Sequence, residues 1–428
     1  MSRLASNRAV EPSGNAADDP RSVSSAVAAG RPVVIAAGGT GGHVVPALAV
    51  ADVLAARGVP VIWFGTRAGI EARLVPVAGI DIRWIDVAGL RGKGPLGLLT
   101  GPLRLVRAIV QSALLLGRLR PRAVLGMGGF VSGPVGLAAV LLRCPLVLHE
   151  QNAVAGLTNR RLARFASRVL AAWPDAFGDA VRAEVIGNPV RGDITARRTA
   201  AIGRPGIAGG DEADGPRAPL ALLVIGGSRG ARALNEIVPA AVAALGVPVA
   251  VRHQCGEADA KAVRARYEEI ARTGRDGTGD GPAVRVEPFI DDMARAYRDA
   301  DLVICRSGAM TVTELAALGV ASILVPFPHA VDDHQSLNAR RLSEAGAALL
   351  LPQPILTAER LAAEITRLAS DRASLGAMAA AARNCFRAGA AEAVADALLE
   401  GGRGASSGAN ATVRDGSPDR PPHGEGAR

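Results

Sequence analysis

Short, continuous apolar runs alternate with segments of helical periodicity along most of the chain. The first series of runs lies at 33–37, 61–65, 123–127, 145–150 and 168–173. The second series lies at 220–227, 249–254, 283–289, 302–308 and 322–327. Strands that are apolar at every position are buried on both faces, which is typical of parallel sheets covered by helices. The pattern therefore predicts an α/β fold with two doubly wound parallel sheets of about five strands each.

The two series divide the chain into an expected N-terminal domain, 31–190, and an expected C-terminal domain, 191–380. A chain of 428 residues is long enough for two domains of this size. A last helical segment, 381–400, is expected to cross back onto the first domain. Four segments rich in Gly, Ser, Pro or charge are predicted to be disordered tails or surface insertions: 1–30, 203–219, 272–282 and 401–428.

Composition narrows the classes of partner. The net charge of +9 favours anionic partners, while an aromatic content of 3% argues against stacking on bases, so no nucleic acid is expected. Residues 1–30 lack the apolar core of a signal peptide. The apolar segment 95–117 contains Arg104 and Arg107, each unfavourable in a bilayer by about 2.5–3.5 kcal/mol, which excludes a spanning helix. The cysteines are too far apart for a disulfide framework or structural zinc, which indicates a reducing cytoplasm: Cys144, Cys255, Cys305 and Cys385.

Glycine-rich turns follow three of the predicted strands. GGTGGH (38–43) and GGSRG (226–230) each lead into a helix, and GMGGFVSGP (126–134) is a second such turn in the first half. Glycine lets the backbone approach a ligand, and a helix N-terminus offers free N–H groups to a phosphate. No turn has the nicotinamide fingerprint or a GKS/GKT sequence. We therefore expect two phosphorylated substrates that face each other across a cleft between the domains.

Eight motifs occur in an order that resembles the peptidoglycan glycosyltransferase family usually called MurG. They are GGTGGH, GMGGFVSGP, HEQN (149–152), AGLTNR (155–160), GNPVR (187–191), GGSRGA (226–231), CRSGAMTVTE (305–314) and DDHQ (332–335). The resemblance covers about 31–400. It implies the GT-B glycosyltransferase fold, with two Rossmann-like domains facing across a cleft. It also implies inverting transfer of N-acetylglucosamine from UDP-GlcNAc to the 4-hydroxyl of MurNAc in undecaprenyl-pyrophosphoryl-MurNAc-pentapeptide.

The resemblance places the donor on the C-terminal half. Glu314 would grip the ribose hydroxyls, Ser228 the diphosphate and Gln335 the sugar hydroxyls. Ile290 would lie at the uracil, and Arg191 would neutralise phosphate. The other donor contacts that it implies are Thr40, Gly41, Gly42, Asn152, Ala309, Met310, Thr311, Val312 and Thr313. No metal or other cofactor is expected, and Asp332 and Asp333 are interpreted as donor-site or helix-capping residues.

His43 is the first candidate for the catalytic base, because it closes a turn that faces the cleft and histidine titrates near neutral pH. Glu150 is the alternative base, or a residue that orients the acceptor. The second turn of the first half is assigned to the acceptor diphosphate through Gly128, Gly129 and Ser132. In that turn the family often has Tyr where this chain has Phe130.

A lipid-linked acceptor implies contact with an anionic membrane surface. We expect 88–107 to form the membrane face, because apolar residues stand beside basic ones there: Leu90, Arg91, Lys93, Leu96, Leu98, Leu99 and Arg104. The part 105–116 fits a core helix with a solvated polar face as well. The resemblance implies a peripheral protein on the cytoplasmic face of the cell inner membrane, with other cell-wall and division proteins as further partners.

Two alternative functions stay open at this point. A UDP-GlcNAc 2-epimerase shares the fold and the donor but needs no membrane face. A nucleotide-sugar-binding module that recruits cell-wall enzymes would bind the donor without turnover. Transfer of label from UDP-GlcNAc to a lipid-linked MurNAc acceptor separates these functions from the transferase.

Overall fold

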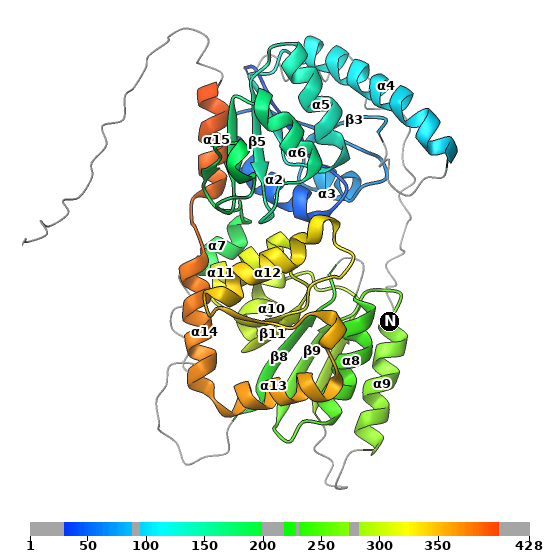
Figure 1. Ribbon diagram of the computed structural model, residues 1–428, viewed down its shortest axis with the longest axis vertical. Coiled ribbons are helices and arrows are strands. Elements are labelled where there is room, and N and C mark those ends of the chain that lie inside the picture. Colours follow the sequence, from blue (N-terminus) through cyan, green and yellow to red (C-terminus); the bar gives the residue numbers. More distant parts are fainter. Residues whose placement is uncertain (1–29, 88–94, 199–217, 228–230, 274–281, 402–428) are drawn as a thin grey trace, which may run out of the picture.

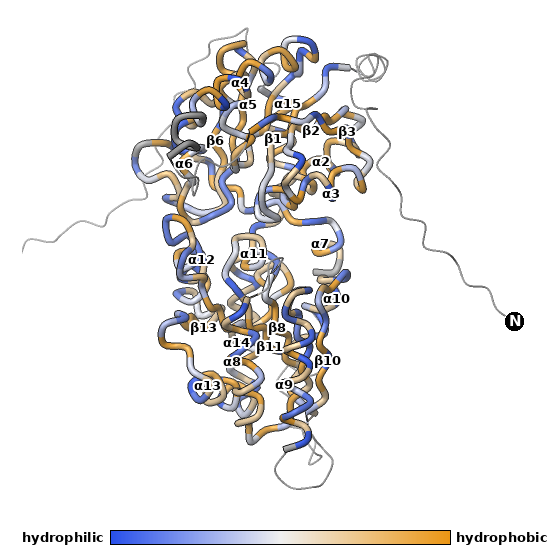
Figure 2. The backbone as a smooth tube through the Cα atoms, turned by 90° about the vertical axis from the view of Figure 1, so that its right-hand side faces the viewer, coloured by the Kyte–Doolittle hydropathy of each residue, from blue (hydrophilic) through white to orange (hydrophobic). Residues whose placement is uncertain are grey.

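A computed structural model describes residues 30–87, 95–198, 218–227, 231–273 and 282–401. The chain forms two α/β domains that lie one above the other along the long axis (Figures 1 and 2). The predicted tails lie outside the described residues, as do most of the two predicted insertions. None of the helices within the described ranges is both long and apolar enough to cross a lipid bilayer.

The N-terminal domain is built on a seven-stranded parallel sheet with the order β3-β2-β1-β4-β5-β6-β7. The strands are β1 Val33–Ala36, β2 Val61–Gly65, β3 Asp81–Trp84, β4 Ala123–Gly126, β5 Leu146–Glu150, β6 Arg168–Ala171 and β7 Glu184–Val185. The helices between them are α2 Gly41–Ala56, α3 Glu71–Val77, α4 Pro95–Leu119, α5 Gly129–Leu141 and α6 Leu157–Leu162. Apolar clusters cover both faces of this sheet, as the continuous apolar runs predict.

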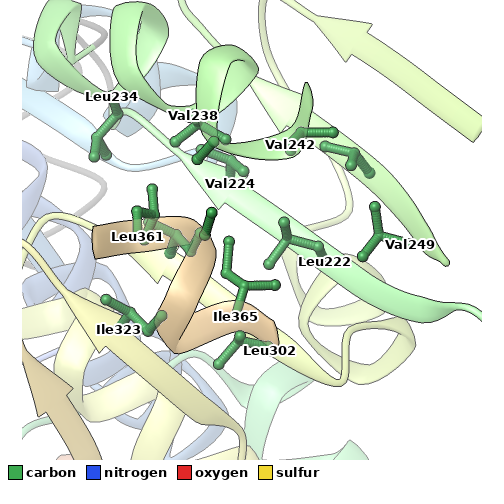
Figure 3. Packing of buried hydrophobic residues seen from close by; sticks show 14 of the residues in the cluster. Leu222, Val224, Leu234, Val238, Val242, Val249, Leu302, Ile323, Leu361 and Ile365 are labelled. Atoms are coloured by element: carbon green, nitrogen blue, oxygen red, sulfur yellow. The ribbon is translucent and has the colours of Figure 1, made fainter. Parts of the chain in front are cut away.

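The C-terminal domain has a six-stranded parallel sheet with the order β10-β9-β8-β11-β12-β13. Its strands are β8 Leu220–Ile225, β9 Val249–Gln254, β10 Ala283–Glu287, β11 Leu302–Cys305, β12 Ala321–Leu324 and β13 Ala348–Leu350. Its helices are α7 Gly192–Arg198, α8 Arg232–Ala243, α9 Ala260–Thr273, α10 Met293–Asp299, α11 Ala309–Leu318, α12 His334–Glu344, α13 Ala358–Ser370 and α14 Arg372–Cys385. Figure 3 shows α8 and α13 packed over one face of the sheet, where Val238 and Ile365 meet Leu222 and Leu302.

Three strands lie outside the two predicted series: β3, β7 and β13. Each pairs with only one neighbour, and two of them, β3 and β7, include exposed positions. Their sequences, DIRW, EV and ALL, are too short or too polar to give a continuous apolar run. The expectation of about five strands in each sheet was therefore too low, because edge strands do not carry the pattern of a strand buried on both faces.

The end of the chain returns to the N-terminal domain. Residues 381–385 still belong to α14, which packs against the C-terminal domain. The helix that crosses over is α15, Ala390–Gly401, drawn in red beside the upper domain in Figure 1. Its residues Ala391, Val394 and Leu398 join the apolar cluster that also contains residues of α2 and β1. The two domains are therefore joined by two stretches of chain.

Candidate functional site

Two helices with uncapped N-termini, one from each domain, are in contact between the domains. Figure 1 shows α2 at the lower edge of the upper domain, above α11, and the two helices are in contact. Neither helix has a side-chain cap, so the N–H groups of Gly41 and Gly42 on α2 and of Ala309 on α11 have no helical acceptor. Free N–H groups and the partial positive charge at the N-terminus of each helix are favourable for binding phosphate groups.

The two glycine-rich turns of the N-terminal domain pack directly on each other. A Cβ at Gly129 would clash with the carbonyl oxygen of Gly38, and Gly129 has φ +79°. A Cβ at Gly128, with φ +92°, would meet the ring of His43 at 3.0 Å. Only glycine fits at these two positions, because a side chain would push the turns apart or displace the histidine.

A buried carboxylate holds the turn GGTGGH (38–43) in place. Glu71, at the start of α3, is fully buried, and its Oε2 accepts a hydrogen bond from the N–H of Gly39 at 3.0 Å. Its Oε1 accepts from the backbone N–H of Thr66 at 2.9 Å and from the Thr66 hydroxyl at 2.7 Å. The turn that carries His43 is thus tied to the end of β2 by a single side chain.

His43 is half-buried and connects to a chain of buried polar groups. Its Nδ1 lies 3.0 Å from Oε1 of Gln151. Nε2 of Gln151 lies 3.1 Å from Nδ1 of His149, and Nε2 of His149 lies 2.9 Å from the carbonyl oxygen of Gly187. Gln151 and His149 are fully buried at the end of β5, on the same side of the strand.

Glu150 points to the other side of β5, and both of its oxygens are occupied. Oε1 accepts from the backbone N–H and the side-chain amide of Asn152, each at 3.0 Å. Oε2 accepts from the N–H of Gly156 at 3.1 Å and from the side chain of Asn159 at 2.9 Å. A carboxylate that is 2% exposed and holds four donors is suited to shaping the loop after β5. His43, by contrast, has a ring nitrogen, Nε2, that no residue in the described part of the chain contacts through a hydrogen bond.

On the C-terminal side, Glu314 of α11 lies beside Tyr297 and Arg191. Burial raises the pKa of Glu314 to about 7, although the positive charge of Arg191 and the hydrogen bond from Tyr297 act to lower that pKa. The Nε of Arg191 is buried and makes no hydrogen bond among the described residues, although Oδ1 of Asp193 lies 3.7 Å from it. A carboxylate and a guanidinium group beside the N-terminal end of α11 offer partners for hydroxyl groups and for phosphate.

Asn338 of α12 fastens the two domains together across the site. It is fully buried, and its Oδ1 accepts from the N–H of Ala153 at 2.8 Å. Its Nδ2 donates to Oδ1 of Asn152 and to the carbonyl oxygen of Ser307, both at 3.2 Å. Nearby, Nδ2 of Asn188 donates to the carbonyl oxygen of Gln151 and to the hydroxyl of Thr313. The described structure is therefore a conformation with the domains in contact.

Comparison with known proteins identifies the family. Residues 33–171 match the glycosyltransferase family 28 N-terminal domain, and residues 221–396 match the C-terminal domain of that family. A relative from Aeromonas hydrophila, named UDP-N-acetylglucosamine–N-acetylmuramyl-(pentapeptide) pyrophosphoryl-undecaprenol N-acetylglucosamine transferase, is 52% identical over 85% of this chain and 95% of its own length. A relative of the same name from Methylococcus capsulatus is 51% identical over 86% of this chain and 98% of its own length. The crystal structure of Acinetobacter baumannii MurG matches with a TM-score of 0.71 and 40% identity over 86% of this chain and 99% of that one.

The chain belongs to the MurG family of glycosyltransferases. The expected GT-B fold with two Rossmann-like domains is confirmed. A glycosyltransferase of kitacinnamycin, 19% identical with a TM-score of 0.59, shares the fold alone.

The structure brings most of the residues expected from the MurG resemblance to the junction between the domains. Thr40, Gly41, Gly42 and His43 lie at the start of α2, and Ala309 to Glu314 lie on α11. Gln335 is half-buried at the start of α12, where its Oε1 accepts from the N–H of Phe327 at 2.9 Å. Asp333 accepts from the hydroxyl of Ser336, and Asp332 forms an ion pair with Arg160 across the domains.

Other expected site residues have buried side chains. The hydroxyl of Ser132 lies 2.7 Å from the carbonyl oxygens of Ala36 and Gly128, which leaves it no free face toward a ligand. Val312 and Ile290 pack into the apolar core of the C-terminal domain. The hydroxyl of Thr313 donates to Ala309 and accepts from Asn188. Val312 is fully buried with its N–H bonded to the carbonyl oxygen of Gly308, and Ile290 is only 2% exposed.

Some expectations fall outside the described residues: Ser228 of the donor site, and Leu90, Arg91 and Lys93 of the membrane face. Leu96, Leu98 and Leu99 belong to the first turns of α4, but their side chains are not described. Within the described ranges, no three His, Cys, Asp or Glu side chains gather in a way that could hold a metal ion.

Sequence reasoning missed four residues of the site: Glu71, His149, Gln151 and Asn338. Two of them were visible in the motif HEQN, because a strand places His149 and Gln151 on one face and Glu150 on the other. Asn338 follows DDHQ by three positions, so a helix starting there would bring it near that motif. Nothing in the local sequence marks Glu71, because its partners Gly39 and Thr66 belong to two other loops.

Proposed function

We propose that this chain transfers N-acetylglucosamine from UDP-GlcNAc to the 4-hydroxyl of MurNAc in undecaprenyl-pyrophosphoryl-MurNAc-pentapeptide, with inversion at the anomeric carbon. The observation that carries the proposal is the junction of the two domains, where α2, which carries His43 in its first turn, is in contact with α11 of the other domain. The relatives from Aeromonas hydrophila and Methylococcus capsulatus are named for this transfer.

In the proposed reaction, the donor is held by the C-terminal domain. Glu314 accepts hydrogen bonds from the ribose hydroxyls, and the guanidinium of Arg191 with the free N–H groups of α11 stabilises the diphosphate. The acceptor oxygen attacks the anomeric carbon as the bond from that carbon to the UDP oxygen breaks. The proton of the acceptor hydroxyl passes to the ring of His43, and UDP leaves with its charge held at the helix N-terminus.

Replacing His43 by Gln tests the base. We expect transfer to fall by about 10²- to 10⁴-fold, because a general base contributes about this much to a proton-transfer step. The affinity for UDP-GlcNAc, measured by calorimetry, should stay within about threefold of wild type. Near-normal transfer by His43→Gln would contradict the assignment.

The product distinguishes the alternatives. With labelled UDP-GlcNAc and a lipid-linked MurNAc acceptor, a transferase gives a labelled disaccharide lipid. An epimerase converts the donor without labelling the lipid, and a binding module leaves both substrates unchanged. Label that never enters the lipid fraction would refute the proposed function.

We further infer that α4 is the part of the protein that contacts the cytoplasmic surface of the membrane. On this helix Leu103, Val106 and Leu114 have exposed fractions of 73%, 55% and 59%. The opposite side of α4 packs against α5 through buried positions that include Leu116. The interpretation of 105–116 as a core helix holds for the side that buries Ala108 and Leu116, but the solvated face is not purely polar, because Val106 and Leu114 are exposed on it.

The polar side chains of α4 fall into two groups. Gln111 turns inward, donating to the carbonyl oxygen of Trp84 and accepting from the N–H of Asp86. Arg104 and Arg107 are exposed beside the apolar side chains, and α4 lies on the outside of the upper domain, far from the C-terminal domain (Figure 1). Exposed apolar side chains flanked by arginines suit shallow insertion into an anionic leaflet.

Charge reversal at Arg104 and Arg107 tests the membrane face. Because a basic residue near an anionic surface contributes about 1 kcal/mol, the double change to Glu should weaken binding to vesicles of anionic phospholipid by at least about 30-fold. The control is the same double change at Arg264 and Arg272, two exposed residues on α9 of the other domain. Equal loss of vesicle binding in both variants, or no loss in either, would contradict a specific role for α4.

A further inference from the structure

We propose that Gln151 is a positioning residue that holds His43 in a single tautomer, with the proton on Nδ1 and the lone pair of Nε2 directed away from the protein. This inference rests on the proposed role of His43 as the base, and it adds how that role is prepared before substrate binds. It is carried by a continuous chain of contacts from His43 through Gln151 and His149 to the backbone of Gly187.

The orientation of the Gln151 amide is fixed by a backbone carbonyl. Its Nε2 lies 3.1 Å from the carbonyl oxygen of His149, which can only accept a hydrogen bond. If the amide were reversed, two oxygens would face each other at that distance in a fully buried place. The NH2 group must therefore face His149, and Oε1 must face His43.

His149 fixes the same orientation independently. Its Nε2 lies 2.9 Å from the carbonyl oxygen of Gly187, so this nitrogen carries the proton. Its Nδ1 is then an acceptor, and it accepts from Nε2 of Gln151 at 3.1 Å. Burial lowers the pKa of His149 to about 4, so the ring stays neutral at physiological pH and keeps this pattern. The two observations agree on where the oxygen of Gln151 points.

The consequence for His43 follows from the inventory of donors and acceptors. Since Oε1 of Gln151 can only accept, Nδ1 of His43 must donate to it across the 3.0 Å contact. Gly128 leaves room for the ring, because a Cβ there would lie 3.0 Å from its Cε1. No described residue provides a hydrogen-bond partner for Nε2 of His43, so its lone pair is available to take the proton of an attacking hydroxyl.

An amide in this place differs from the carboxylate that orients histidine in many hydrolases. Gln151 carries no net charge, so it sets the tautomer and the ring direction without strongly stabilising an imidazolium. When Nε2 takes the proton of the acceptor hydroxyl, Nδ1 keeps its own proton and its bond to Oε1. No proton needs to move along the chain to His149.

The tautomer can be read directly in the full-length protein with 15N-labelled histidine, by long-range proton–nitrogen correlation of the ring nitrogens. The chain has six histidines, and the His43 signals are assigned as those missing from His43→Gln. Wild type should show His43 protonated on Nδ1 only. In Gln151→Met, which keeps the length of the side chain but removes the acceptor, the Nε2-protonated form should appear.

Kinetics provide the second measurement. For Gln151→Met we expect kcat for label transfer to fall by about 10- to 100-fold, with the KM for UDP-GlcNAc within about twofold of wild type. Gln151→Glu restores an oxygen opposite Nδ1, and its second oxygen, when protonated, can donate to the carbonyl oxygen of His149 as the amide does. In this form it should recover the Nδ1-protonated tautomer and part of kcat. If Gln151 had only a structural role, kcat would fall to the same extent in Gln151→Met and Gln151→Glu.

The control is Gln111→Met, which removes a half-buried amide of the same domain, bonded to the backbone of Trp84 and Asp86. It should leave the tautomer of His43 unchanged. Wild-type His43 protonated on Nε2, or an unchanged tautomer in Gln151→Met, would overturn the proposal. If wild type failed to label the lipid acceptor, the proposed function would fail while the tautomer result could still be read.

Discussion

Replacing Glu71 by Gln changes one atom at the anchor of the His43 turn. The carboxylate accepts three hydrogen bonds, two on Oε1 from Thr66 and one on Oε2 from Gly39. A glutamine has a single acceptor oxygen, so whichever way the amide is turned, its NH2 group faces a backbone N–H. The side chain has no room to turn away, because Gly38, Gly65 and Gly69 pack against it so closely that a Cβ at any of them would clash.

The size of the effect follows from these contacts. A hydrogen bond to a charged group contributes about 1.5–3 kcal/mol, and a buried donor left without a partner costs about 1–3 kcal/mol. We expect the free energy of unfolding of the N-terminal domain to fall by about 2–4 kcal/mol. With a urea m-value of about 1–3 kcal/mol/M, the midpoint should drop by about 0.7–4 M.

Tryptophan fluorescence in urea is the assay, since the chain has three tryptophans and Trp63 is fully buried on β2, beside the anchored turn. Transfer should also fall, while UDP-GlcNAc binding by the C-terminal domain should persist. The control is Glu236→Gln on α8, whose ion pair with Arg232 is exposed to solvent and contributes little to stability. If Glu71→Gln unfolded at the same midpoint as this control, the anchoring role of Glu71 would be refuted.

Two further predictions concern the donor side and the contact between the domains. Because burial raises the pKa of Glu314 from its ordinary 4.5 to about 7, the stability that its protonated form contributes is fully present below pH 4.5 and is lost as the pH rises through 7. The loss amounts to up to about 3 kcal/mol, so Glu314→Gln should flatten this part of the curve of unfolding free energy against pH. Parallel curves for the two proteins would contradict the raised pKa. Asn338→Leu keeps the volume of the side chain but leaves the N–H of Ala153 without its partner, so it should favour conformations with separated domains by about 1–3 kcal/mol. Small-angle scattering should show a larger radius of gyration, and kinetics should show a lower kcat. An unchanged radius of gyration would contradict the role of Asn338 in holding the domains together.

The central strands and the glycine-rich turns could be predicted because both leave a local signal. β1, β4 and β11 are buried at every position, so their apolar runs are continuous, and the turn after β1 and the start of α11 stand out by their glycines and motifs. The edge strand β3 could not be predicted in this way, because one of its faces is partly in water and its sequence, DIRW, mixes charge with apolar residues. Local pattern therefore identifies the middle of each sheet better than its edges.

The candidate site was predictable in its location but not in its bonding. The position of His43 follows from its turn, whereas its contact with Gln151 joins residues 108 positions apart and depends on how β4 and β5 lie beside β1. The motif resemblance could not separate residues that face the cleft from those that support it. Ser132 and Val312 belong to motifs, and both side chains are buried away from any ligand. Side-chain direction is a property of the tertiary structure, so it lies beyond a pattern of residue types.

The return of α15 to the first domain has a consequence for how the protein is made. Ala391, Val394 and Leu398 complete an apolar cluster whose other members come mainly from α2 and the first sheet. During synthesis, about 200 residues separate the last strand of that sheet from α15, which at about 5–20 residues per second corresponds to roughly 10–40 s. Throughout this interval the apolar residues of α2 and the first sheet that α15 later covers stay uncovered. The N-terminal domain is thus synthesised first and completed last, and a chain that stops before residue 390 lacks the helix that covers these apolar residues.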